Sequence, residues 1–248
     1  IYCRQTVMNE SKVRFRPADI VIEEIRRYKL TNIAFHADTS TMNKKWILDF
    51  CDKVKMLPWK VRIVCNSRVD TVDYEMMVEM KKAGFWMICF GCESGNNKVL
   101  EMNKKETTVE KARESVRLAK KAGLKVWTYW MLGMLGDTKE TMEQTIKLAC
   151  DLNADISNFA ISAPYPGTEY GKIVEENGWL KEKSWEKYDQ NYSAQVDLPN
   201  CSRELILKMQ RKAYLKWYLS LRGIKFLFYS FKLEYFSYFY KTIKDHLR

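Results

Sequence analysis

The chain has 248 residues, 46% of them hydrophobic, which excludes a disordered protein and leaves room for one large domain with an appendage. Its seven cysteines lack the paired spacing of a disulfide framework, and no apolar run reaches the ~20 residues of a membrane span, so we expect a reducing, cytoplasmic location. The formal charge of +11 is spread over short lysine pairs rather than one block, which favours solvated helix faces over a nucleic-acid partner.

Strand-length apolar segments alternate with helical patterns over the first 172 residues. The apolar segments begin near residues 32, 60, 86, 125 and 157, and every connection between them is long enough for a crossover. Thr107 with Glu110, and Asp137 with Glu140, have the spacing of residues that cap a helix. These repeated βα units predict an α/β fold built on a parallel sheet or barrel.

The character of the sequence changes after about residue 172. We expect two helices there, over about 202–222 and 225–246, and twelve aromatic side chains fall between Tyr214 and Tyr240. Helical spacing puts Tyr214, Trp217 and Leu221 on one stripe. Such a stripe is usually a packing surface, so we predict that the tail folds onto the preceding domain. An amphipathic tail that contacts a membrane surface peripherally is the alternative.

Two of the strand-like segments end in a polar turn that contains glycines and opens a helix. The first turn reads Phe90-Gly91-Cys92-Glu93-Ser94-Gly95, and the second reads Gly133-Met134-Leu135-Gly136-Asp137-Thr138. Reactive groups gather at the carboxyl ends of parallel strands, where a charge rarely belongs to packing, so Glu93 is the strongest candidate for a functional side chain. The glycines of the second turn favour a tight strand-to-helix turn over a phosphate-binding loop, because a fuller glycine fingerprint is absent.

The cysteine and histidine patterns argue against two other kinds of site. Cys89 and Cys92 form a CxxC, but positions three apart on a strand point to opposite faces, which disfavours a zinc or redox pair. The chain has two histidines, His36 and His246, so we expect neither a histidine-rich metal site nor a histidine-based catalytic triad.

Four loops resemble those of the radical S-adenosylmethionine enzymes, in the branch that usually carries an upstream cobalamin-binding domain. They are Asn66-Ser67-Arg68-Val69-Asp70, Phe90 to Gly95, Met131 to Thr138, and Ala163-Pro164-Tyr165-Pro166-Gly167-Thr168-Glu169. Each loop is a weak signal, but their order and spacing are specific together, and the resemblance covers roughly residues 1–175. It implies a partial (β/α)6 TIM-like barrel over residues 1–172 that lacks its first strand, followed by a helical, aromatic-rich C-terminal module over residues 173–248.

The start of the chain, Ile1-Tyr2-Cys3, is similar to the end of the family's CxxxCxxC loop, in which an aromatic residue precedes the last cysteine. The resemblance implies that Cys3 is a ligand of a 4Fe–4S cluster and that Tyr2 lies beside the cofactor. It also implies that the first strand and two further cysteines lie upstream of residue 1. A single cysteine near a terminus is more often inert, so this assignment depends on the loops downstream.

The resemblance further implies that S-adenosyl-L-methionine binds through its amino and carboxylate groups to the open iron of the cluster. Asp38, Arg68 and Glu93 occupy the positions at which the family places its binding residues. Judged from the residues alone, a turn or helix cap explains Asp38 equally well, and a structural ion pair competes for Arg68.

The implied enzyme cleaves S-adenosylmethionine reductively and starts radical chemistry on a small-molecule substrate. Methyl transfer to an unactivated carbon and oxidative cyclisation are both implied, with cobalamin held by a domain outside this chain and electrons from a donor such as flavodoxin or ferredoxin. The fragment alone is expected to be inactive. Two alternatives stay open: a non-catalytic interaction module whose basic aromatic tail binds a membrane surface or RNA, and a (β/α) enzyme without a cluster.

Overall fold

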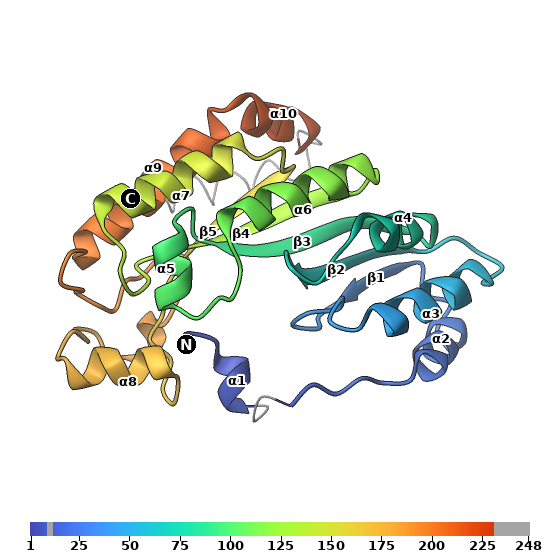
Figure 1. Ribbon diagram of the computed structural model, residues 1–248, viewed down its shortest axis with the longest axis horizontal. Helices are drawn as coiled ribbons and strands as arrows, with labels where there is room; N and C mark the ends of the chain where they lie inside the picture. Colours follow the sequence, from blue (N-terminus) through green and yellow to red (C-terminus); the bar gives the residue numbers. More distant parts are fainter. Residues whose placement is uncertain (9–11, 231–248) are drawn as a thin grey trace.

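The computed structural model describes residues 1–8 and 12–230, which form one parallel sheet with helices packed against it (Figure 1). The sheet has five strands, ordered as they occur along the chain, and all four pairings are parallel. The strands are β1 (Asn32–Phe35), β2 (Arg62–Arg68), β3 (Phe85–Glu93), β4 (Lys125–Leu132) and β5 (Ile156–Ile161). The predicted α/β fold is confirmed, as an open parallel sheet.

Every connection between strands contains at least one helix. The connecting helices are α3 (Lys44–Lys55), α4 (Tyr74–Lys82), α5 (Asn97–Met102), α6 (Val109–Lys121) and α7 (Lys139–Asp151). The others are α1 (Arg4–Met8), α2 (Ala18–Arg27), α8 (Glu169–Glu176), the short 3₁₀ turn η1 (Trp185–Lys187), α9 (Arg203–Tyr218) and α10 (Leu221–Ser230). Figure 1 shows α6, α7 and α9 running along one side of the sheet, with α1 and α8 near the end of β5.

The two faces of the sheet are buried to different degrees. Buried and less buried side chains alternate along β2, β4 and β5. Phe90, Trp130 and Phe159 belong to the fully buried face, which packs against the helices. Asn66 and Tyr129, on the other face, are partly exposed, although Met87 and Cys89 of β3 are buried there too. A parallel sheet covered on both faces would be buried throughout, so within the described residues one face is fully covered and the other only in part.

Side-chain caps begin α6 and α7 one residue later than the sequence pattern suggested. Thr108, rather than Thr107, accepts a hydrogen bond from a backbone amide in the first turn of α6. Thr138, rather than Asp137, begins α7, where Thr138 and Thr141 each accept from the backbone amide of the other. Two candidate caps are adjacent at both places, and spacing alone does not choose between them.

Helix α9 packs against β5 and α7, so the described part of the C-terminal segment folds onto the sheet, as predicted. Gln210 of α9 donates a hydrogen bond to the Phe159 carbonyl at 2.8 Å, and the Tyr214 ring meets the Phe159 ring edge-on with centroids 5.4 Å apart. The predicted stripe is correct for the buried Trp217 and wrong for Leu221, which is 88% exposed because α9 has already ended. The domain boundary expected after residue 172 falls inside α8.

The predicted break between the two C-terminal helices, at about 222–225, is wrong. Helix α9 ends at Tyr218 and α10 begins at Leu221. The Ser220 hydroxyl accepts from the Gly223 amide at 3.2 Å, so Gly223 lies in the first turn of α10. A Cβ on Gly223 would stand 2.1 Å from the Trp217 carbonyl oxygen, so glycine allows this tight turn. The rest of the second predicted helix, with His246, lies outside the described residues. In the described chain, no helix combines the length and hydrophobicity that a membrane span needs.

Candidate active site

Three of the five residues singled out in the sequence lie together at the carboxyl edge of the sheet. Arg68 is the last residue of β2 and Glu93 is the last residue of β3. Tyr2 reaches this edge from the start of the chain and hydrogen-bonds to the Glu93 carboxylate, while the Arg68 charge is close enough to lower the pKa of the Tyr2 phenol. The convergence follows from the parallel topology, which brings the ends of neighbouring strands to one edge.

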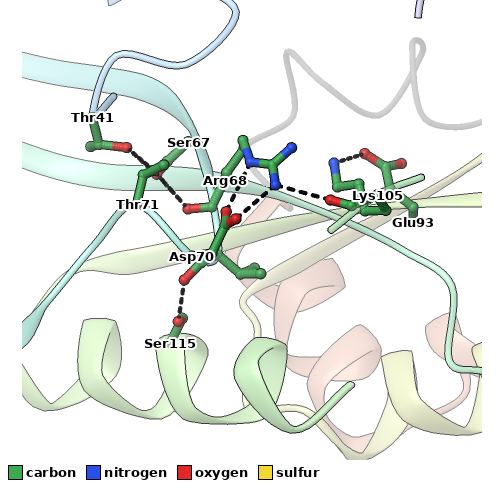
Figure 2. Close-up of polar contacts among 9 residues, drawn as sticks. Thr41, Ser67, Arg68, Asp70, Thr71, Glu93, Lys105 and Ser115 are labelled. Carbon is green, nitrogen blue, oxygen red and sulfur yellow. Dashed lines mark hydrogen bonds and ion pairs between the residues drawn. The ribbon is translucent and has the colours of Figure 1, made fainter. Parts of the chain in front are cut away.

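Lys105 joins this group, and sequence reasoning did not select it. Its ammonium lies 2.8 Å from Glu93 Oε1, and the side chains of Lys105 and Glu93 are only 10% and 12% exposed (Figure 2). The Lys105 carbonyl accepts a hydrogen bond from Arg68 Nη2 at 2.9 Å. An ion pair so well shielded from water is screened much less than a surface pair. We call Tyr2, Arg68, Glu93 and Lys105 the polar cluster.

The backbone at Glu93 is unusual for a strand. The register of the β3–β4 pairing shifts between Gly91 and Glu93, which leaves one extra residue of β3 opposite β4. Glu93 itself has φ +66°. Bulges of this kind re-aim side chains, and left-handed non-glycine residues often mark functional positions. The Glu93 carboxylate folds back over Gly91: a Cβ there would stand 2.6 Å from Glu93 Oε1 and 3.3 Å from Lys105 Nζ. Glycine at position 91 therefore makes room for the ion pair.

The loop that carries Lys105 is held on both sides. Lys104 and Glu106 have φ values of +51° and +56°, so Lys105 lies between two residues in the left-handed region. Before them, the Asn103 side chain donates from Nδ2 to the Leu135 carbonyl at 2.9 Å, which ties the loop to the turn after β4. Three residues with positive φ therefore lie in or beside one ion pair: Glu93 is a member of it, and Lys104 and Glu106 flank its other member. Such strain persists only where the surrounding structure fixes it.

Arg68 is held by a two-pronged pair with Asp70, at 2.9 Å from Nε and 2.6 Å from Nη2. Although burial raises the pKa of Asp70, the hydrogen bonds and charge of Arg68 hold it below its ordinary value. Hydroxyl groups fix the turn behind the pair: Ser67 and Thr71 both donate to the Arg68 carbonyl, and Thr41 bonds to both of them at 2.6 Å (Figure 2). The structural ion pair weighed for Arg68 thus exists beside its contact with the polar cluster.

The first residues of the chain present one thiol near the polar cluster. Burial, followed by the charge of Glu93, raises the pKa of Tyr2, so its phenol stays protonated. Cys3, the next residue, is exposed. Ile1 is fixed because its carbonyl accepts from the Tyr170 amide of α8 at 3.1 Å. Among the described residues, no three histidine, cysteine or acidic side chains are grouped as a metal ion requires. Cys3 therefore offers one thiolate, which fits one corner of an iron–sulfur cluster and not the whole of it.

Asp38, the fifth predicted residue, lies elsewhere. It lines a cavity of about 510 Å³ beside the edge strand β1, together with Phe15, Ile33 and Trp46, and no residue of the polar cluster lines that cavity. The turn around Asp38 is tied to the exit of β2, because the Ser40 amide donates to the Asn66 carbonyl at 3.0 Å. The structure does not bring Asp38 into the polar cluster.

The turn after β4 is structural, as predicted. Gly133 and Gly136 have φ values of +77° and +83°. Asp137 is buried and accepts from the Met134 amide at 2.9 Å and from the Thr141 hydroxyl at 2.7 Å. Burial raises the pKa of Asp137 to about 6. Its carboxylate accepts hydrogen bonds from both sides of the turn and so closes the loop on itself.

The CxxC cysteines are inert. Cys89 and Cys92 are both buried, and both thiols are free. Burial raises the pKa of the Cys89 thiol to about 11, and burial raises that of Cys92 as well. Neither thiol is ionised near neutral pH, so neither is a good ligand or nucleophile.

The polar cluster presents a carboxylate and two cationic groups side by side at a strand edge. Residues 1–149 match the model of the Radical SAM superfamily. The chain belongs to this superfamily. Its members use a 4Fe–4S cluster with S-adenosylmethionine, a ligand whose amino-acid end carries one positive and one negative charge. Membership also disfavours the alternative of a non-catalytic interaction module.

Curated relatives of this radical SAM chain include methyltransferases and a cyclase. An uncharacterized methyltransferase of Pyrococcus horikoshii is 31% identical over 223 residues, which are 88% of this chain and 48% of the relative. An anaerobic magnesium-protoporphyrin IX monomethyl ester cyclase of Cereibacter sphaeroides is 33% identical over 165 residues, 62% of this chain and 27% of the relative. The chain thus spans about half the length of these relatives or less.

Solved structures support the radical SAM fold. The methyltransferase TsrM from Kitasatospora setae, determined with cobalamin and a [4Fe-4S] cluster, has a TM-score of 0.58 at 18% identity, over 68% of this chain and 36% of that one. Coproporphyrinogen III oxidase from Escherichia coli has a TM-score of 0.57 at 17% identity, over 86% of this chain and 46% of that one. At such identities the likeness concerns the fold.

Proposed function

We propose that the polar cluster binds the amino-acid end of S-adenosylmethionine and that the complete gene product uses this ligand for radical chemistry on a small molecule. The observation that carries the proposal is the shielded Glu93–Lys105 pair, which contacts both Tyr2 and Arg68 at the carboxyl edge of the sheet. Tyr2 is followed directly by Cys3. Charges with so little exposure are costly to bury, and they are better explained by a charged ligand than by packing.

Each side chain has a role that its charge allows. The Glu93 carboxylate accepts hydrogen bonds from the ligand's ammonium group, and the Lys105 and Arg68 side chains donate to the ligand's carboxylate. In the described structure the Lys105 ammonium pairs with the Glu93 carboxylate. Arg68 is held by Asp70 and by the Lys105 carbonyl, so the side chains that the ligand would contact are already oriented. Tyr2, whose pKa is raised by burial and by the charge of Glu93, stays neutral beside them and covers the pair from water.

Cys3 supplies one of the thiolates that hold the cluster, and the remaining ligands come from residues outside this chain. When bound, the cluster provides the electron that breaks the sulfonium C–S bond of the ligand. The chain's own part is to hold the ligand in one orientation at the strand ends and to exclude water from its charged groups.

The substrate lies over the carboxyl edge, and a cobalamin-binding domain outside the chain completes the enzyme. Methyltransferases and a cyclase are both among the relatives, so methyl transfer and oxidative cyclisation are the two reaction classes that we propose. The cobalamin part rests on the resemblance of the four loops to the cobalamin-associated branch. An acidic flavodoxin or ferredoxin is the electron donor in this scheme.

The test uses the complete gene product, purified without oxygen. Cys3→Ala should lower the iron content and abolish release of 5′-deoxyadenosine from S-adenosylmethionine in the presence of dithionite. Cys150→Ala is the matched control, because Cys150 is a free, partly exposed thiol on α7, far along the chain from the polar cluster. Unchanged iron and deoxyadenosine release in Cys3→Ala would overturn the cluster assignment.

A further inference from the structure

The outward face of α9 exposes aliphatic side chains beside cations. Leu207, Leu215 and Leu219 line one shallow surface with four cationic residues, which are Lys208, Arg211, Lys212 and Lys216. Leu215 and Leu219 are 48% and 75% exposed, while the opposite side of the helix packs on β5 and α7. We call this surface the α9 face.

Further aliphatic side chains are exposed at the start of the next helix. Leu221 and Ile224, in the first turn of α10, are exposed as well. Four large aliphatic side chains are thus exposed between residues 215 and 224. Single exposed leucines need no explanation, but four exposed aliphatic side chains within ten residues, two of them on a surface that cations line, indicate an interaction surface.

The cations of the α9 face are available to a partner. Lys212 pairs with Glu143 of α7, but in the part of the chain that the structure describes no ion pair involves Lys208, Arg211 or Lys216. The one acidic residue that lines the face is Glu204, in the first turn of the helix. The face therefore has a net positive charge and is complementary to an anionic surface.

We propose that the α9 face docks on an anionic lipid surface, with its leucines in the headgroup region and its cations on the lipid phosphates. A helix with aliphatic residues flanked by lysine and arginine is the form that lies in a membrane interface. The sequence that follows supports this occupant, because residues 227–240 contain eight Phe or Tyr residues and two lysines lie at 232 and 241. Aromatic rings and lysine side chains are typical of the headgroup level. A nucleic acid would match the cations but would leave the leucines in water.

The charge test uses the full chain and co-sedimentation with vesicles of equal parts phosphatidylglycerol and phosphatidylcholine. The chain should bind these vesicles and lose binding as salt rises or when phosphatidylglycerol is left out. Replacing Lys208, Arg211 and Lys216 by Gln should lower partitioning about 10- to 100-fold, since each removes one attraction to the anionic surface. The control variant also loses two lysines and one arginine, but at exposed positions outside the α9 face: Lys45→Gln, Lys60→Gln and Arg113→Gln.

The apolar test is matched in the same way. Leu215→Ser with Leu219→Ser should also weaken binding, whereas Ile20→Ser with Met56→Ser should not, although those two side chains are as exposed, at 49% and 73%. Circular dichroism spectra that match those of the unmodified chain establish that the variants are folded.

Three results would overturn the proposal. The first is an unmodified chain that does not bind anionic vesicles. The second is an equal loss of binding in the α9 variants and in their controls, which would assign the binding to net charge alone. The third is a chain that ignores vesicles but binds polyuridylic acid through the α9 cations, which would assign the face to RNA.

Discussion

The turns after β3 and β4 start from the same pattern, a strand followed by glycines, an acid and a helix, and they use the acid in opposite ways. After β3, Glu93 meets a lysine from a separate loop and a tyrosine from the start of the chain. After β4, Asp137 accepts its hydrogen bonds from its own turn, from the Met134 amide and the Thr141 hydroxyl. One acid faces charged groups that converge from elsewhere, and the other closes a loop.

The difference shows how a strand-end acid in a site is distinguished from one that supports the fold. The Asp137 carboxylate accepts hydrogen bonds from neighbours within four residues, so these bonds define one turn. Glu93 is held in a strained backbone conformation, and its partner Lys105 lies between two more strained residues. Local satisfaction marks a cap, whereas strain combined with distant partners marks a site.

The largest effect that separates the two acids should be the pH dependence of Asp137. Its folded-state pKa of about 6 lies above the ordinary 3.8, so the folded chain binds this proton more tightly than the unfolded chain. The stabilisation is complete below about pH 4 and is lost as the pH rises through about 6, a change of about 3 kcal/mol. Relative to Asp137→Asn, the unmodified chain should lose about this much free energy of unfolding between pH 4 and pH 7, as measured by urea unfolding.

The Asp137→Asn variant is needed because Asp70 and Asp155 also change the stability at acidic pH, with the opposite sign. Their cationic partners hold their pKa values low despite burial. Taking the difference between the two proteins cancels these contributions. A difference that does not change with pH would contradict the burial of an ionisable Asp137.

The next largest effect is a difference in the stability that is lost when Gly133, after β4, or Gly91, near the end of β3, is replaced by alanine. Gly133→Ala should cost about 2 kcal/mol of stability, because the new Cβ would require a left-handed backbone and would stand 2.7 Å from Ile206 Cδ1. Gly91→Ala should cost less than about 1 kcal/mol, because its Cβ would meet only the movable ends of Glu93 and Lys105. Urea unfolding of both variants measures the comparison, and equal losses would show that Gly91 has a structural role too.

The smallest effect is the coupling within the polar cluster. A double-mutant cycle with Glu93→Gln and Lys105→Met should give a coupling of about 1 kcal/mol in the ligand-free protein. Because both side chains are shielded, the coupling should change little with salt. The exposed Lys104–Glu169 pair, 2.7 Å apart, is the control and should couple weakly and lose its coupling as salt rises. A Glu93–Lys105 coupling that disappears in salt would show that water reaches the pair.

The strands could be predicted from sequence because each is an apolar segment of the right length between turn signals. Glu93 and Arg68 could be placed for the same reason, since both end such a segment. The contact of Gly91 with the Glu93 carboxylate could not, because it depends on a bulge that shifts the register beyond Gly91. Alternation along a strand does not reveal such a bulge.

Lys105 was missed because its position depends on backbone conformation rather than on periodicity. It stands in a lysine pair that is typical of solvated charge, and no periodicity indicates the positive φ values of Lys104 and Glu106 or the contact with Glu93. Asp70, two residues after Arg68, is a local partner that spacing could have indicated. Asp38 follows its strand as predicted but lines the cavity beside β1, which no pattern in the sequence marks.

The most direct test of the central claim is calorimetric titration of S-adenosylmethionine into the complete, cluster-containing gene product and its Glu93→Gln variant. The polar cluster predicts that the variant loses about 1–3 kcal/mol of binding free energy, because a charge-assisted hydrogen bond to the ligand's ammonium group is removed. Glu101→Gln, the same change at an exposed position on α5, should bind like the unmodified protein. Equal affinity in all three proteins, with a lower melting temperature for Glu93→Gln alone, would contradict the claim and leave Glu93 with a structural role.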